Sequence, residues 1–196
     1  MSAIQDNLSL IKQNVQELAV KYNREITLVA MSKTKPIQEI MECYQTGHLH
    51  YGENILAKIP NLYVVETIDS EKQANMLSKQ LDRKMNIFLQ VNTSNEENKS
   101  GIKPENLDGL VEAVLQLPNL ELKGLMTIGS FDNSHSEGLN PDFQVLMNCK
   151  SRIEQKYNLK LQVSMGMSDD YEQAIHQGST NVRVGSKIFG PRIYKK

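Results

Sequence analysis

The hydrophobic and polar positions of this chain alternate between a helical period and an extended one. Near the N-terminus, apolar residues recur every three or four positions and predict a helix with one apolar face: Ile4, Leu8, Ile11, Val15, Leu18 and Tyr22. Short apolar runs of strand length then alternate with further helical stretches. The seven strand candidates are residues 26–33, 49–52, 63–68, 86–92, 120–128, 159–165 and 180–185. This alternation indicates parallel β–α–β units and an α/β fold.

The helices between these strands are marked by apolar spacing and by end signals. Pro36 suits the first turn of a helix, and Gly47 is placed to end that helix. Ser70 and Ser168 are candidate N-caps of two later helices. The apolar positions of three helices are Ile37, Ile40, Met41 and Tyr44; Leu107, Leu110, Val111 and Val114; and Phe143, Met147, Ile153 and Tyr157.

Two architectures fit this pattern, a (β/α)₈ barrel and a doubly wound sheet. The chain has 196 residues, which is the lower edge of the barrel range of roughly 200 to 250 residues. No break in composition marks a linker, so one domain over residues 1–196 is expected. One junction is short, because only ten residues, interrupted by Pro60, separate Gly52 from Tyr63. A parallel crossover needs roughly 10–12 residues, so this junction indicates that a unit is missing.

Composition narrows the function classes. Hydrophobic residues make up 39% and charged residues 23%, with a formal net charge of −1. This balance favours neither nucleic acid nor an acidic membrane as a partner. The sequence has no apolar run near the roughly 20 residues that span a bilayer, and no signal-peptide pattern, so a cytoplasmic protein is expected. The two cysteines and four histidines lack metal-ligand spacing, which favours reduced thiols and no metal.

The first strand candidate ends in "SKTKP", residues 32–36. Lys33 can be a surface lysine in a loop, or an amine removed from water whose lone pair attacks an aldehyde. Strand parity puts Lys33 on the same face as Val29 and Met31. Lys35 shares that parity, but it precedes Pro36 in the turn and is therefore expected to be solvent-exposed.

The last two units carry a second signal. "GMSDD", residues 166–170, begins a helix, and "VRVGSKIFG", residues 182–190, joins the final strand to a short helical turn. Barrels hold phosphate after strands 7 and 8, at the N-terminus of a short extra helix. Gly166, Ser168, Gly185 and Ser186 suit such a cradle, although turns and caps use the same residues. Together with Lys33, the cradle suggests pyridoxal 5′-phosphate (PLP) as cofactor.

Five motifs then carry a resemblance over nearly the whole chain. "LVAMSKTKP", "HYGEN", "NKSGI", "GLMTI" and "MGMSDDYEQAIHQGSTNVRVGSKIFG" resemble the pyridoxal-phosphate homeostasis protein family, whose members are single-domain relatives of the alanine racemase N-terminal barrel. The resemblance implies a (β/α)₈ barrel with an extra N-terminal helix. It also implies a Schiff base between PLP and Lys33. The other implied cofactor-binding residues are Ser168, Gly185 and Ser186 at the phosphate, Arg183 at the pyridine nitrogen, and Asn54 in the pocket wall.

The resemblance implies a role in vitamin B6 homeostasis, in which a monomer binds PLP, buffers it and delivers it to PLP-dependent apoenzymes without catalytic turnover. This chain departs from the family pattern after Asn54, where a helix and a strand reading roughly "HFIGxLQxNK" are absent. The third of eight strands is therefore expected to be missing. Two alternatives remain: a racemase-like PLP enzyme, with Tyr51 or Tyr171 as the nearest candidate base, and a truncated variant with impaired PLP binding.

Overall fold

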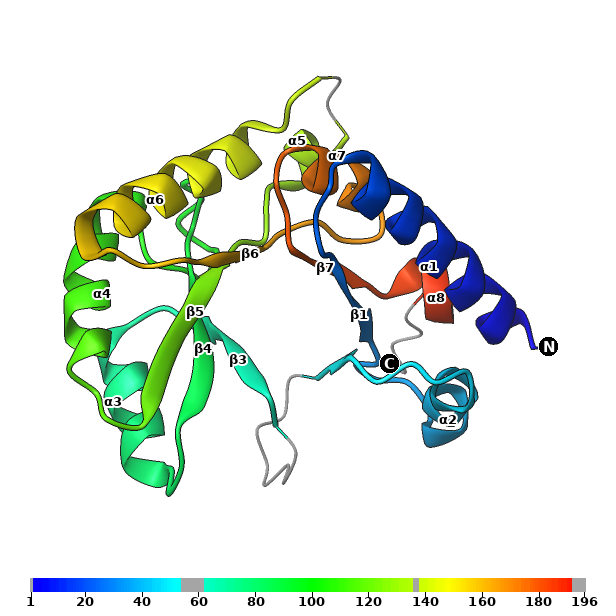
Figure 1. Cartoon of the computed structure of the whole chain (residues 1–196), viewed down its shortest axis with the longest axis horizontal. Coiled ribbons are helices and arrows are strands. Elements are labelled where there is room, and N and C mark those ends of the chain that lie inside the picture. Colours follow the sequence, from blue (N-terminus) through cyan, green and yellow to red (C-terminus); the bar gives the residue numbers. More distant parts are fainter. Residues whose placement is uncertain (1, 54–61, 136–137, 192–196) are drawn as a thin grey trace. The chain divides into compact units, whose positions relative to one another are not determined.

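The computed structural model (Figure 1) describes residues 2–53, 62–135 and 138–191. The chain divides into two compact units. The first unit is Met1–Lys58 together with Gly166–Lys196, and the second unit is Ile59–Met165. Described residues from the N-terminal and C-terminal parts of the sequence therefore belong to the same unit. The expectation of one domain over residues 1–196 stays a prediction.

The first unit holds three parallel strands in the order β2-β1-β7. Its elements are α1 (Ala3–Lys21), β1 (Thr27–Met31), α2 (Ile37–Gln45), β2 (Tyr51–Gly52), α7 (Tyr171–His176), β7 (Asn181–Val184) and α8 (Ser186–Phe189). Val29 of β1 is paired with Arg183 of β7, and Ala30 is paired with Tyr51 of β2. This register decides which side chains share a face of the sheet.

The predicted N-terminal helix is confirmed as α1. It begins with a capping box, in which the Ser2 side chain accepts from the backbone N–H of Gln5 and the Gln5 side chain accepts from that of Ser2. Figure 1 shows α1 beside α7 and α8, which its contacts confirm. One buried cluster joins these helices to one face of the strands, and it includes Leu8, Ile11, Val15, Leu28, Ala30, Val182, Val184, Ile188 and Phe189. The helices therefore cover the face of β1 and β7 that carries Leu28 and Val182.

The second unit holds four parallel strands in the order β6-β5-β4-β3. Its strands are β3 (Val64–Ile68), β4 (Met85–Gln90), β5 (Leu120–Met126) and β6 (Gln162–Ser164). Its helices are α3 (Glu71–Gln80), the 3₁₀ turn η1 (Pro104–Asn106), α4 (Leu107–Leu115), α5 (Phe131–Ser134) and α6 (Pro141–Tyr157). The predicted N-cap of α3 is confirmed, because the Ser70 side chain accepts from the backbone N–H of Gln73.

One hydrogen bond shows that this four-stranded sheet is curled. The Ser164 hydroxyl on β6 donates to the Glu66 carboxylate on β3 at 2.6 Å, although β5 and β4 lie between these strands in the sheet. Side chains from two strands so far apart meet only on the concave side of a curved sheet. A wall of this kind is what a barrel requires.

The seven predicted strands are all present among the described residues, and every strand pairing in the two units is parallel. The α/β fold class is therefore confirmed. The short junction between Gly52 and Tyr63 falls mostly on residues 54–61, which lie outside the described residues.

Candidate cofactor-binding site

The site is built on the face of β1 and β7 that the helices leave uncovered. Leu28 and Ala30 face the helices, so the alternate residues Val29 and Met31 project to the other side of the strand. Arg183 is the register partner of Val29 and shares that face. Lys33 lies beyond the end of β1, in the turn that follows the strand. Its predicted direction toward the same face as Val29 and Met31 stays a prediction.

The loop that carries Lys33 is a tight turn with a strained residue. The backbone N–H of Lys35 donates to the Ser32 carbonyl at 2.9 Å, which closes the turn. Thr34 within it has a φ of +67°, a conformation that β-branched residues rarely adopt. Ser32 is buried, and its hydroxyl donates to the Glu53 carboxylate at 2.6 Å. The conformation of this loop is therefore specified by its surroundings, as is common at functional sites.

Lys33 itself is half-buried in this turn. Among the residues that the structure describes, its amine has neither a hydrogen-bond acceptor nor an ion-pair partner. Lys35, two positions later, uses its amine in contacts within the protein. The two lysines of the "SKTK" motif therefore differ in the contacts that their amines make with the described residues.

The loop around Ser168, where the sequence predicts a phosphate cradle, has a different geometry from the predicted helix cap. Ser168 is not the N-cap of α7: that helix begins at Tyr171, and Asp170 is its N-cap. The Asp170 carboxylate accepts from the backbone N–H of Met167 at 2.6 Å, which fixes this turn. The buried Ser168 hydroxyl instead accepts from the backbone N–H groups of Gly185 and Lys187, each at 3.3 Å. It therefore ties the loop after β6 to the start of α8.

Two glycines make this arrangement possible. Gly166 has a φ of +94°, and a Cβ there would lie 2.5 Å from the Cβ of Ala174, so a larger residue is excluded. A Cβ at Gly185 would lie 3.3 Å from the Cβ of Met31 on β1. The start of α8 consequently approaches β1 closely, just before the loop that carries Lys33. Ser186, the first residue of α8, is exposed.

Arg183 supplies a buried positive charge to the same face. It is 8% exposed, it lies between Val182 and Val184, and its backbone N–H donates to the Gly166 carbonyl at 3.0 Å. A guanidinium stays charged at any physiological pH. Five of the six predicted site residues belong to the first unit: Lys33, Ser168, Arg183, Gly185 and Ser186. The sixth, Asn54, lies outside the described residues.

The prediction for Lys35 was wrong. Its side chain is only 12% exposed. Its Nζ donates to the carbonyl of Phe189 at 2.7 Å and to that of Pro191 at 3.3 Å. The last carbonyls of a helix lack intrahelical partners and attract cations, so the side chain turns toward α8 instead of water. Parity and Pro36 could not reveal this contact, because α8 is about 150 residues away in the sequence.

Among the described residues, no group of three or more histidine, cysteine, aspartate or glutamate side chains is placed to hold a metal ion. No helix formed by these residues is long and apolar enough to cross a bilayer. Both cysteines are free and buried. Burial raises the pKa of Cys43 to about 11, which keeps this thiol protonated and unreactive at neutral pH.

Comparison with known proteins defines the class first. Residues 42–192 match the model of the alanine racemase N-terminal domain. The solved alanine racemase of Corynebacterium glutamicum superimposes with a TM-score of 0.75 at 14% identity, over 96% of this chain and 60% of that one. This chain therefore has the TIM-barrel-like fold of the alanine racemase N-terminal domain, with a helix before the first strand, as predicted.

Closer relatives define the family. The pyridoxal phosphate homeostasis protein of Schizosaccharomyces pombe is 40% identical, over all of this chain and 96% of the relative. PipY of Synechococcus elongatus, solved without PLP, has a TM-score of 0.78 at 26% identity, over 95% of this chain and 100% of that one; a second PipY structure has PLP bound. The chain belongs to the pyridoxal phosphate homeostasis protein family.

The alignment with the S. pombe relative also bears on the length of the chain. It extends over 229 residues, whereas this chain has 196. The relative therefore has a substantial number of residues without a counterpart here. A missing helix–strand unit after Asn54 agrees in size with this difference.

Proposed function

We propose that this chain binds PLP through a covalent bond to Lys33 and holds it for vitamin B6 homeostasis. One observation supports the proposal: the register of β1 and β7 puts Arg183 beside Val29 on the face that the helices leave uncovered, and Gly185, next to the Ser168 hydroxyl, approaches Met31 at the end of β1, two residues before Lys33. An amine, an arginine and an anion-binding loop around one surface are the groups that a phosphorylated pyridine aldehyde requires.

Each residue has a distinct part in this proposal. Lys33 would hold PLP through a carbon–nitrogen double bond, which its neutral amine forms with the aldehyde by its lone pair; the aldehyde oxygen and the two amine hydrogens would leave as water. The phosphate would be held by Ser168, Gly185 and Ser186, as the family resemblance implies. In the structure, the Ser168 hydroxyl accepts from the N–H of Gly185, which leaves its own hydrogen free to be donated to a phosphate oxygen. Asn54 is proposed to line the pocket, as the family resemblance implies.

Arg183 supports binding without turnover. At the pyridine nitrogen, the position that the family resemblance implies for Arg183, an arginine would disfavour protonation of that nitrogen, and carbanion stabilisation profits from a protonated ring. PLP held in this way would be kept as a bound aldehyde and would be a poor acceptor of electrons for catalysis. We therefore propose that the protein buffers PLP and delivers it to PLP-dependent apoenzymes. Its proposed state is a cytoplasmic monomer.

The two tyrosines weighed as racemase bases are engaged in packing. The Tyr171 hydroxyl accepts from Asn14 of α1 at 3.0 Å, and its ring is fully buried in the helical cluster. The Tyr51 hydroxyl donates to the His48 carbonyl at 3.1 Å. Burial raises the pKa of each tyrosine to about 12, so neither phenol is ionised near neutral pH. A racemase-like mechanism therefore gains no base from them.

The test is chemical labelling of the purified protein. PLP is added, the carbon–nitrogen bond is reduced with borohydride, and the modified residue is located by peptide mass mapping. We expect the label on Lys33, together with a visible absorbance band that Lys33→Ala abolishes. Lys33→Arg is the matched control, because it keeps the positive charge and lacks a primary amine; it too must lose the band.

Two results would overturn the proposal. A label on Lys35, or on several lysines to similar extents, would show that Lys33 has no special role. The absence of any lysine-dependent band would favour the reading of a truncated variant with impaired binding. If the band is present, amino-acid racemisation and transamination are then assayed, and sustained turnover that depends on Lys33 would replace the carrier function with an enzymatic one.

A further inference from the structure

The short helix α8 is held at both ends by side chains from distant parts of the chain. At its start, the Ser168 hydroxyl accepts from the N–H groups of Gly185 and Lys187. At its end, the Lys35 ammonium donates to the carbonyls of Phe189 and Pro191. Asn7 of α1 also donates to the Ile188 carbonyl at 3.2 Å. The position of this helix is therefore set by tertiary contacts, since four residues are too few to form a stable helix alone.

Lys35 is in a restricted environment. Its side chain is 12% exposed, and the Glu39 carboxylate lies 3.9 Å from its Nζ on the next helix. Hydrogen bonds from an ammonium to carbonyl oxygens are stronger than neutral ones. A cation at the C-terminus of a helix also interacts favourably with the helix dipole. These contacts make the Lys35–α8 bridge a defined link and not a passing surface contact.

The bridge joins the two parts of the proposed cofactor site. Lys35 is two residues from Lys33 and in the same turn, which its own backbone N–H closes onto Ser32. At the other end of the bridge is α8, whose first residues form the proposed phosphate cradle. Strain at Thr34 (φ +67°) means that this turn needs external contacts to keep its shape. A change at Lys35 would therefore alter the separation between the Lys33 amine and the cradle.

We propose that Lys35 is a positioning residue for PLP: by bridging the Lys33 turn to the C-terminus of α8, it sets the distance between the aldehyde-binding amine and the proposed phosphate-binding residues Ser168, Gly185 and Ser186. This inference rests on the proposed function. It makes a specific claim about ligands: a ligand that contacts both ends of the site depends on Lys35, whereas a ligand that contacts only Lys33 does not.

The experiment compares PLP with pyridoxal, which has the same aldehyde and no phosphate. Dissociation constants are measured from the lysine-dependent absorbance band for the wild type, Lys35→Met and Lys35→Arg. Lys35→Met keeps most of the apolar stem and removes the donor; we expect it to weaken PLP binding by about tenfold or more, the size of a lost charge-assisted hydrogen bond. Its affinity for pyridoxal should change by less than about twofold.

Two variants separate positioning from general effects. Lys35→Arg offers donors to the same carbonyls, so we expect it to bind PLP within about threefold of the wild type. Lys21→Met, at the exposed end of α1, removes one positive charge from the same unit and should leave both affinities unchanged.

The outcomes are distinct. Equal weakening of PLP and pyridoxal by Lys35→Met, including loss of both through misfolding, would make Lys35 a general structural residue and overturn the inference. Unchanged PLP binding in Lys35→Met would also overturn it, and the proposed function would stand. A wild-type protein without any lysine-dependent band would instead remove the proposed function itself.

Discussion

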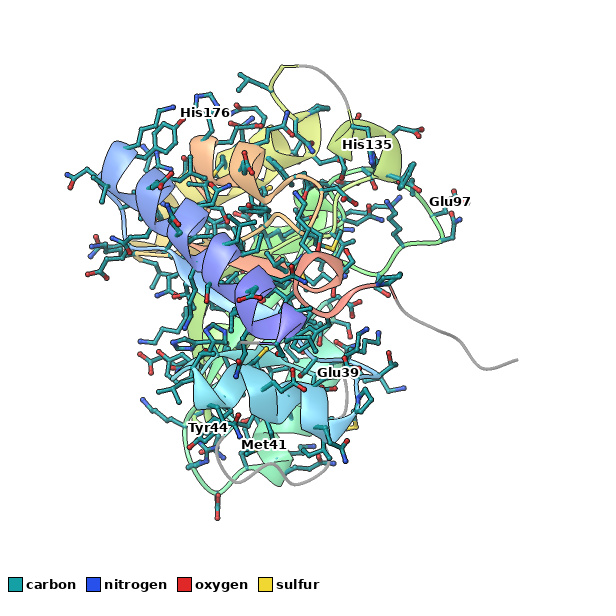
Figure 2. The ribbon with its side chains drawn as sticks, turned by 90° about the vertical axis from the view of Figure 1, so that its right-hand side faces the viewer. Glu39, Met41, Tyr44, Glu97, His135 and His176 are labelled. Carbon is teal, nitrogen blue, oxygen red and sulfur yellow. The ribbon has the colours of Figure 1, made fainter. Side chains whose placement is uncertain are left out.

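Helices α2 and α4 have the same length and a similar pattern of apolar residues, yet the apolar face of α4 is buried and that of α2 is largely exposed to solvent. Both have nine residues, with apolar side chains at helical spacing. In α4, all four apolar residues of the predicted face are buried, at 4% exposure or less: Leu107, Leu110, Val111 and Val114. In α2, Ile37, Met41 and Tyr44 are 64%, 44% and 53% exposed, and Cys43 is the one fully buried residue. Figure 2 shows Met41 and Tyr44 on this helix.

The difference teaches that apolar spacing encodes a helix but not the partner that covers it. α4 packs against β5 in its own unit. α2 precedes the place where this chain is expected to lack a helix–strand unit of its family. In a (β/α)₈ barrel each outer helix packs beside the next one, so the expected loss of that unit would leave the apolar face of α2 without a neighbouring helix. The following predictions test this comparison, in order of expected effect.

The largest effect is expected from Leu110→Ala in α4. Removing a buried leucine side chain leaves a cavity, and such changes cost about 3 to 4 kcal/mol. Leu110 is 4% exposed, so its surroundings cannot readily fill the space. Urea denaturation of the cofactor-free protein, followed by circular dichroism, measures the loss. A change below about 1 kcal/mol would mean that α4 is not packed as the structure has it.

A smaller effect is expected from His48, which lies just after α2 and is 5% exposed. Burial, and then the nearby charge of Lys12, lower the pKa of His48 from 6.5 to about 4. Between about pH 6.5 and pH 4, His48 therefore binds a proton in the unfolded chain but not in the folded protein. Stability is complete above that pH and falls by about 2 to 3 kcal/mol as the pH drops toward 4.

The ring nitrogen Nε2 of His48 lies 2.9 Å from the His50 carbonyl oxygen. The neutral imidazole can therefore donate a hydrogen bond to that oxygen. Denaturation curves at pH 7 and pH 5 measure the effect in the wild type and in His48→Gln. Because carboxylates also titrate at low pH, the informative quantity is the difference in pH dependence between the two proteins. Identical slopes would show that the end of α2 is not anchored by a buried neutral histidine.

The smallest effect is expected from Met41→Ala in α2, the counterpart of Leu110→Ala. Both changes remove an apolar side chain of similar size from the apolar face of a nine-residue helix. Met41 is 44% exposed, so we expect a loss of about 0.5 kcal/mol or less, as is usual for surface substitutions. The same urea titration applies. A loss comparable to that of Leu110→Ala would show that another surface covers α2 in solution, and would remove the contrast between the two helices.

Some features of the candidate site can be predicted from local sequence patterns, and others depend on contacts between distant segments. Lys33, Ser168, Gly185 and Ser186 are candidates because strand ends, glycines and cap residues have local signatures, and Arg183 is one because the family motif contains it. The predicted use of Ser168 as an N-cap was wrong. Its hydroxyl bonds to N–H groups 17 and 19 residues later, and nothing in "GMSDD" distinguishes that use from capping its own helix.

The sequence by itself determined the alternation of strands and helices, the parallel α/β class, the N-terminal helix and the positions where polar groups follow strands. These depend on local periods and on residues within a few positions of one another. Only the tertiary structure decided that α2 exposes its apolar face, that His48 is buried, and that Lys35 holds α8 in place. Each of these features depends on which distant segment packs against the residue. Such packing is decided by contacts between segments, and the pattern within a single segment does not specify it.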